Sequence, residues 1–138
     1  MSRYIPESLR DFVAQRAFHR CEYCLVPQQM VGYPYEIDHV LSLKHGGATK
    51  ASNLAYACPI CNGNKGSDIC SILGDELPAE LFRFFNPRFD SWETHFSLNS
   101  GEILPKTPIG AVTVKIFDFN QPEDVELRLK LQNTGLFP

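Results

Sequence analysis

Two short cysteine motifs constrain this chain more than any other feature. Cys21-x-x-Cys24 and Cys58-x-x-Cys61 each hold two thiols at the spacing of a zinc knuckle. Four thiolates at about 2.3 Å complete a tetrahedral zinc site of the structural kind, with no position open for catalysis. Binding of this kind contributes on the order of 10 kcal/mol to folding. We therefore predict that zinc ties the ends of segment 21–61 together.

Other uses of the cysteines are weaker. The count of five leaves one cysteine without a partner, and the first ten residues lack the apolar core of a signal peptide. We expect a cytoplasmic protein without a membrane segment, where disulfide frameworks are uncommon. A redox dithiol remains an alternative, although no thioredoxin-like pattern surrounds either motif. Cys70 lies outside both motifs, and we expect a small buried hydrophobic residue there.

Size and composition indicate one folded domain over residues 1–138. Hydrophobic residues make up 43% of the chain and charged residues 21%, which is ordinary for a globular protein. A chain of 138 residues can bury a single core. The formal net charge of −3 argues against coating nucleic acid by bulk electrostatics, but it does not describe local patches.

Hydrophobic periodicity and turn residues predict a mixed α+β chain. Two short strands are expected on either side of a loop that contains Gly46 and Gly47, and a hairpin is expected around residues 92–104. Residues 107–117 fit either a helix or a strand, and we favour a helix because Thr107 and Pro108 suit its start. The other predicted helices cover residues 6–19, 62–67, 78–85 and 121–132.

The segment between the two motifs carries a specific set of polar residues. Asp38 and His39 end the first predicted strand, Asn53 precedes the second, and Asn62 follows the last cysteine. A half-buried acid needs a cation or a donor to offset its lost hydration. With "CPICN" and Lys65, these positions resemble the HNH endonuclease family in its four-cysteine form, over about residues 20–68. The stretches "FNPRFDSW", "THF" and "TPIG" also resemble the carboxy-terminal part of a bacterial subgroup.

The resemblance implies a fold and an activity. The fold would be a zinc-stapled ββα-metal core, treble-clef-like, over about residues 20–68, with flanking helices and a short β-hairpin. Residues 71–138 would form a carboxy-terminal extension. The activity would be metal-dependent endonuclease cleavage of nucleic acid, with double-stranded DNA as the expected partner. The alternative is a zinc-stabilised module that binds nucleic acid or protein without chemistry.

Phosphodiester hydrolysis suggests roles for these residues. The imidazole of His39 suits a general base at neutral pH. Asp38 and Asn62 offer hard oxygen atoms to one magnesium or manganese ion. The family often has histidine at the position of Asn62, so an amide there favours oxygen-preferring ions. By resemblance, Asn53 joins the catalytic group by fixing the loop and orienting the base, and an ordinary turn hydrogen bond is the alternative.

Two further residues could assist this site. Glu36 lies two positions before Asp38, so it points to the same side of an ideal strand. It either assists the metal or faces solvent. Lys65, with Lys44 and Lys50, could form a positive rim that meets a DNA backbone.

Overall fold

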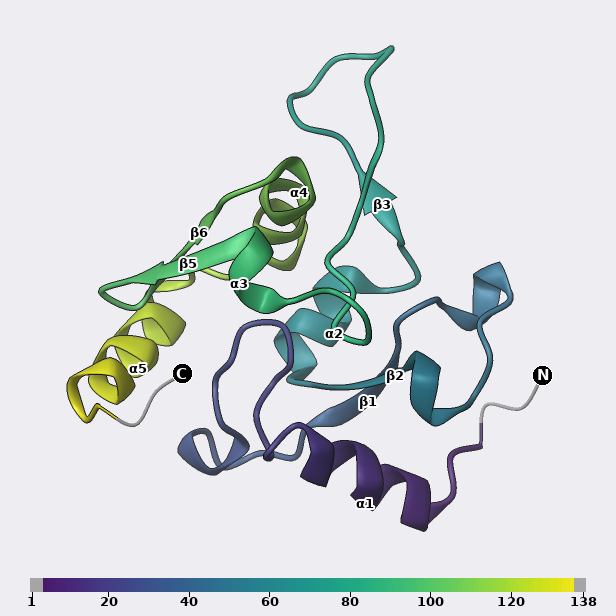
Figure 1. Cartoon of the computed structure of the whole chain (residues 1–138), viewed down its shortest axis with the longest axis vertical. Helices are drawn as coiled ribbons and strands as arrows, with labels where there is room; N and C mark the ends of the chain where they lie inside the picture. Colours follow the sequence, from purple (N-terminus) through teal and green to yellow (C-terminus); the bar gives the residue numbers. More distant parts are fainter. Residues whose placement is uncertain (1–3, 136–138) are drawn as a thin grey trace.

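The computed structural model describes residues 4–135 and shows an α+β fold with three separate two-stranded antiparallel sheets (Figure 1). No helix in this range has both the length and the apolar character that a bilayer crossing requires. The elements are α1 (Glu7–Arg16), η1 (Gln28–Met30), β1 (Glu36–His39), η2 (Leu43–His45), η3 (Ala51–Asn53), β2 (Leu54–Ala57), α2 (Pro59–Lys65), β3 (Cys70–Ser71), β4 (Phe82–Arg83), α3 (Trp92–His95), β5 (Phe96–Asn99), β6 (Glu102–Pro105), α4 (Pro108–Phe117) and α5 (Pro122–Asn133).

A ββα unit forms the centre of the amino-terminal half. Strands β1 and β2 pair so that Asp38 lies opposite Ala55 and His39 opposite Leu54. All four residues of β2 are buried, which explains its continuous apolar sequence. Helix α2 follows at once, with Cys58 as its N-cap and a proline in its first turn. The predicted strand pair with its glycine loop is therefore confirmed.

Helix α1 is shorter than the predicted helix over residues 6–19. It ends at Arg16, and Phe18 and His19 both have a φ of 55°, in the left-handed region. This reversal leads the chain into the first knuckle, where Arg20 forms an isolated bridge with Pro27. The requirements of the knuckle therefore override helical propensity at these positions.

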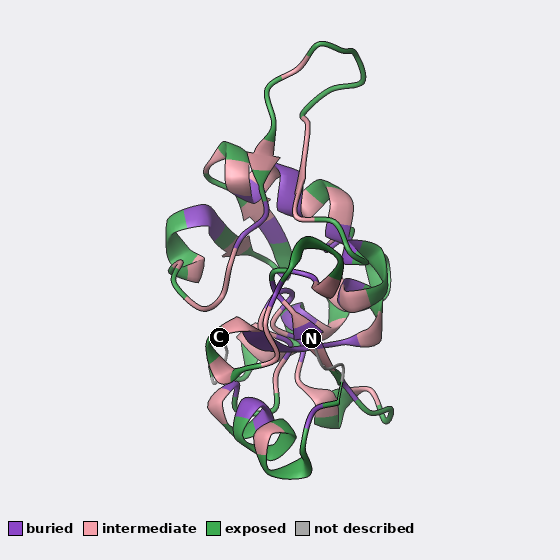
Figure 2. Ribbon diagram, turned by 90° about the vertical axis from the view of Figure 1, so that its right-hand side faces the viewer, coloured by how far each residue is buried: buried purple, intermediate pink, exposed green. Residues whose placement is uncertain are grey.

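Aromatic side chains join the carboxy-terminal half to the first knuckle. Tyr23, which is fully buried between two of the cysteines, packs on Phe117 at 4.9 Å and on Phe85 at 6.5 Å between ring centroids. The indole Nε1 of Trp92 donates to the carbonyl oxygen of Tyr23 at 3.0 Å. Figure 2 shows the buried positions concentrated where the elements meet. One core cluster therefore contains residues from both halves of the chain.

The helix predicted over residues 78–85 is wrong. This stretch instead contains β4, which pairs with β3, and the loop between the two strands projects from the body of the protein (Figures 1 and 2). The reason is tertiary, because Phe84 and Phe85 are both buried and the Phe85 amide donates to Oγ1 of Thr113 in α4. The other preferences hold, since residues 108–117 form helix α4 and β5 and β6 form a hairpin.

A buried arginine anchors the last helix. Arg128 of α5 has no exposed surface. Its guanidinium donates to the carbonyl oxygens of Gly101 and Phe119, each at 2.7 Å, and to that of Cys24 at 3.4 Å. The last contact reaches the first knuckle. A cation buried this deeply is tolerated because oxygen atoms replace its hydration.

Replacing Arg128 with methionine tests this anchor. The variant leaves several carbonyl oxygens without a donor, so we expect the free energy of unfolding to fall by about 3 kcal/mol, as measured by urea denaturation. Lys130→Met is the matched control, because Lys130 lies on the same helix with an exposed side chain. An equal loss of unfolding free energy in the two variants would contradict this role of Arg128.

Candidate active site and metal centre

The four knuckle cysteines come together in the structure. The Sγ atoms of Cys21, Cys24, Cys58 and Cys61 all lie within 4.8 Å of one another, and all four residues are buried. A tetrahedron with Zn–S bonds of about 2.3 Å has edges of about 3.8 Å. The Sγ atoms of Cys24 and Cys58 are 3.8 Å apart. The geometry and the soft donors therefore fit a structural zinc ion.

Backbone donors support the thiolates that such a site requires. The amide of Cys24 donates to Sγ of Cys21 at 3.4 Å, and the amide of Cys61 donates to Sγ of Cys58 at 3.3 Å. The second contact lies at the first turn of α2, where amide groups favour negative charge. Burial and the neighbouring sulfur atoms raise the pKa of the Cys61 thiol well above its ordinary value. A bound cation would reverse that effect by stabilising the thiolates.

Asp38 lies in a buried network that the sequence did not reveal. Its Oδ2 accepts a hydrogen bond of 2.6 Å from the hydroxyl of Tyr23, and its Oδ1 forms an ion pair of 3.1 Å with Nζ of Lys65. The same Nζ donates to the carbonyl oxygen of His39 at 3.0 Å. Burial raises the pKa of the Asp38 carboxyl, and the Lys65 cation and the Tyr23 hydroxyl oppose that rise.

Lys65 does not lie on the positive rim that the sequence predicted. Only 2% of its surface is exposed, so it cannot meet a DNA backbone. Its place three residues after Asn62 on α2 turns both side chains toward β1. Lys65 therefore compensates the charge of Asp38 from inside the protein, whereas Lys44 and Lys50 are exposed.

His39 ends β1 and is held by a residue from the following loop. Its Nε2 lies 2.9 Å from Oγ1 of Thr49. Burial lowers the pKa of the imidazole, with a smaller contribution from the Lys65 cation, while Asp38 opposes the change. The neutral form, which can accept a proton, therefore predominates at neutral pH.

Asn53 fixes the loop that follows β1. Its Oδ1 accepts from the amide of Leu41 at 2.8 Å, and its Nδ2 donates to the carbonyl oxygens of Leu41 and Ala48, each at 2.9 Å. Gly47 lies so close that a Cβ atom there would be 1.7 Å from the Leu41 carbonyl oxygen. The amide of Asn53 and the absent side chain of Gly47 thus set the loop that carries Thr49. The part of Asn53 in orienting His39 stays a prediction.

Asn62 and Glu36 contact each other. Nδ2 of Asn62 donates to Oε1 of Glu36 at 2.8 Å across the exposed edge of β1. The contact uses the amide nitrogen, so Oδ1 of Asn62 is the atom that could serve a cation. Glu36 is exposed, but its carboxylate belongs to this local group and does not only face solvent.

An open hollow of about 300 Å³ brings the predicted residues together. Its lining includes Asp38 and His39 from β1 and Asn62 from α2, with Ser42 and Lys44 on the loop side. Asn53 does not line it. Sequence reasoning missed Tyr23 and Thr49, because a tyrosine inside a cysteine motif and a threonine in a glycine loop carry no pattern that marks them.

Two substitutions should distinguish the structural role of the four cysteines from the chemical role of the candidate active site. Cys24→Ser removes one thiolate of the tetrahedron, so we expect loss of bound zinc and loss of the cooperative unfolding transition. Asp38→Asn keeps an oxygen acceptor beside Tyr23 and Lys65, so zinc and fold should remain while any activity falls. Elemental analysis of the purified proteins gives the zinc content and circular dichroism the fold. Wild-type protein that contains no zinc would contradict the prediction of a structural zinc ion.

Comparison with known proteins agrees with this geometry. No curated protein and no solved structure matches the chain. Residues 21–68 match the sequence model of the family described as HNH endonuclease. The match does not extend to the later stretches, so their resemblance to a bacterial subgroup stays a prediction. The matched segment begins at the first knuckle cysteine and ends just after α2, so the HNH endonuclease match covers all four cysteines that could hold a metal ion.

Proposed function

We propose that this protein is a metal-dependent endonuclease that hydrolyses phosphodiester bonds in double-stranded DNA. The proposal rests on one observation: Asp38, His39 and Asn62 line the same open hollow on the cysteine-anchored ββα unit. Hydrolysis needs a base for water, stabilisation of charge on the phosphate, and a rigid frame. These side chains supply the first two requirements, and the knuckles supply the third.

His39 is the base in this proposal. Its lowered pKa keeps the ring neutral at pH 7, ready to accept a proton from a water molecule. Thr49 holds Nε2, so Nδ1 is the ring atom left to accept that proton when Thr49 accepts a hydrogen bond from Nε2. In the alternative tautomer, Nδ1 carries the proton and Nε2 accepts the hydrogen bond from Thr49. In either case Thr49 limits rotation of the ring.

Asp38 and Asn62 supply oxygen atoms for one magnesium or manganese ion. Such an ion, when bound, would stabilise negative charge on the phosphate and on the leaving oxygen. A carboxylate has about four acceptor positions, so its contacts with Tyr23 and Lys65 do not exhaust it. Lys65 does, however, balance the charge of Asp38. We therefore expect weak binding of the divalent ion, strengthened when DNA phosphates share it.

The buried ion pair is also the observation that favours a second candidate. If Lys65 holds Asp38 permanently, the hollow has no charged ligand for a metal, and the domain would be a zinc-stabilised binding module. Asn62 opposes this, because it lines the hollow and its contact with Glu36 uses Nδ2, which leaves Oδ1 for a cation. Cleavage assays decide between the two.

Supercoiled plasmid provides the direct test. Wild-type protein with magnesium or manganese should convert closed circles to nicked circles, resolved on agarose. His39→Ala should nick about 10²- to 10⁴-fold more slowly, because a positioned base contributes about that much. His45→Ala is the matched control, since His45 is an exposed histidine of the glycine loop. Plasmid that stays closed with every divalent ion would support the binding module instead.

The pH dependence of nicking gives a second test. The base must be neutral, and burial lowers its pKa from the ordinary value of 6.5. The rate should therefore rise with pH through a midpoint below 6.5 and stay level through neutral pH. Initial rates with saturating metal in constant-ionic-strength buffers give the profile. A midpoint clearly above 6.5 would contradict a neutral His39 as the base.

A further inference from the structure

Three arginines line two adjoining hollows outside the candidate active site. Arg16 belongs to both hollows, one of about 260 Å³ that also includes Arg20 and one of about 530 Å³ that also includes Arg88. Ser52 and Phe89 complete the second hollow. We call this surface the arginine groove and define it by these five residues.

The groove keeps an excess of positive charge, although the carboxylate of Glu22 also lines its first hollow. Glu22 pairs with Arg88, and Asp90, which reaches the first hollow, pairs with Arg83. Neither Arg16 nor Arg20 forms an ion pair with any residue between 4 and 135. Arg16 bonds only to neutral carbonyl oxygens, those of Ala51 at 3.0 Å and Leu54 at 2.6 Å. The chain as a whole has a net charge of −3, so this is a local excess.

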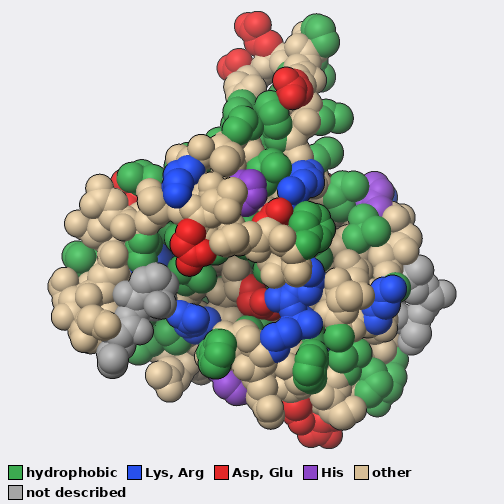
Figure 3. Space-filling model, in the orientation of Figure 1, with side chains coloured by type: hydrophobic (Ala, Val, Ile, Leu, Met, Phe, Trp, Pro, Cys, Tyr) green, Lys and Arg blue, Asp and Glu red, His purple; other side chains and the backbone are tan. Residues whose placement is uncertain are grey.

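The surface view shows where acidic side chains gather. In Figure 3, they occupy the projecting loop at the top, whereas the middle of the face carries basic and acidic side chains together. The projecting loop, between β3 and β4, carries Asp75, Glu76 and Glu80. A polyanion that approaches this face is therefore repelled from the projection.

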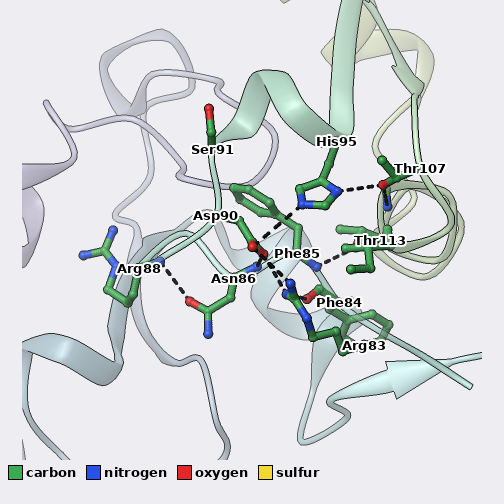
Figure 4. Close-up of polar contacts among 12 residues, drawn as sticks. Arg83, Phe84, Phe85, Asn86, Arg88, Asp90, Ser91, His95, Thr107 and Thr113 are labelled. Atoms are coloured by element: carbon green, nitrogen blue, oxygen red, sulfur yellow. Dashed lines mark hydrogen bonds and ion pairs between the residues drawn. The ribbon is translucent and has the colours of Figure 1, made fainter.

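Arg16 and Arg88 are held in place before any ligand arrives. Arg16 also stacks over the ring of Phe12, with its Cζ 5.3 Å from the centroid. Arg88 lies on a turn fixed by Asn86, whose Oδ1 accepts from the Arg88 amide and whose own amide donates to Asp90. Figure 4 shows this network, with the Arg88 side chain pointing away from the Arg83–Asp90 pair. Binding of a ligand would therefore cost these side chains little additional conformational entropy.

Two guanidinium groups lie close enough to oppose each other. Burial lowers the pKa of Arg16, the charge of Arg88 lowers it further, and the charge of Glu22 opposes both effects. Nε of Arg16 and Nε of Arg88 are both buried without a hydrogen-bond partner among the described residues. The carboxylate of Glu22, which pairs with Arg88, offsets part of this repulsion. An anion at the open side of the groove would offset more of it through charge-assisted hydrogen bonds.

The groove is connected to the candidate active site through η3 and β2. Ser52 of η3 lines the groove, and its neighbour Asn53 fixes the loop that carries Thr49. Leu54, whose carbonyl oxygen accepts from Arg16, pairs with His39 across the sheet. A chain of regularly spaced phosphates could therefore contact both places.

We propose that the arginine groove binds the phosphodiester backbone of duplex DNA next to the bond that is cut. The inference rests on the proposed function for the identity of the ligand. Phosphate is the anion class that matches two fixed guanidinium groups, and a backbone supplies it repeatedly. Phe89, which is 69% exposed at the rim, offers an apolar contact to sugar or base. Contacts of this kind position DNA without reading its sequence.

Binding of a labelled duplex, measured by fluorescence anisotropy over a range of salt, tests the groove. All variants carry His39→Ala and bound zinc, so cleavage does not interfere. Arg20→Gln should weaken binding and lower the slope of log Kd against log salt by about one, the effect of one phosphate contact. The Arg20 side chain makes no hydrogen bond or ion pair with residues 4–135, so the substitution removes none from the fold. Lys130→Gln on α5 removes an equal charge elsewhere and should leave the slope unchanged.

A second pair of variants adds charge instead of removing it. Ser52→Glu places an acid in the groove at an exposed position and should weaken binding, whereas Ser97→Glu on the exposed face of β5 should not. Thermal unfolding confirms that each variant is folded. Equal slopes for Arg20→Gln and Lys130→Gln, together with equal affinities for the two glutamate variants, would overturn the proposal.

Competitors identify the chemistry of the ligand. At constant ionic strength, inorganic phosphate should not displace the duplex, because one phosphate lacks the repeated contacts. Displacement by it would reduce the groove to a small-anion site and overturn the proposal. Poly-glutamate that binds as tightly as the duplex would also overturn it, in favour of an acidic protein partner.

Cleavage separates this inference from the proposed function. If wild-type protein nicks no plasmid but Arg20→Gln still lowers the salt slope, the groove stands and the nuclease proposal fails. If wild-type protein nicks plasmid and the groove variants bind and nick like their controls, the nuclease proposal stands and the groove fails.

Discussion

Four buried thiols bring together two parts of the chain that are far apart in sequence, the first knuckle and the start of α2. The turn at residues 21–24 and the start of α2 meet at one point, with two sulfur atoms only 3.8 Å apart. The strands β1 and β2 lie between these two ends, and four residues in each strand could not form a stable hairpin alone. A cation at this point fixes where the strands begin and where α2 is placed against them.

The carboxy-terminal half completes the same structure. Tyr23 and the carbonyl oxygen of Cys24 are covered by residues far along the chain, Phe117 and Arg128 among them. The buried hydroxyl of Tyr23 then reaches Asp38. Packing in the second half is thus connected to the candidate active site through one tyrosine. This connection gives the extension a physical role, whether or not it contacts DNA.

The polar network beneath the hollow shows how one carboxylate can serve two purposes. Lys65 and Tyr23 satisfy Asp38 in the folded protein, which a buried acid requires. The same contacts reduce its negative charge and so its attraction for a divalent ion. In the proposed nuclease, the nucleic acid would therefore supply part of the free energy of metal binding. Coupling of this kind would limit metal binding to the complex with substrate.

Local sequence was sufficient for several features. The spacing of the cysteines indicated the metal centre, and Gly46 and Gly47 marked the loop, because ligand geometry and backbone space depend on nearby residues. Tertiary structure decided the rest. Lys65 turned inward, Thr49 reached His39, and residues 82–83 formed a strand instead of a helix. Each depends on partners distant in sequence, such as Thr113 for Phe85, and burial against such partners outweighs propensity.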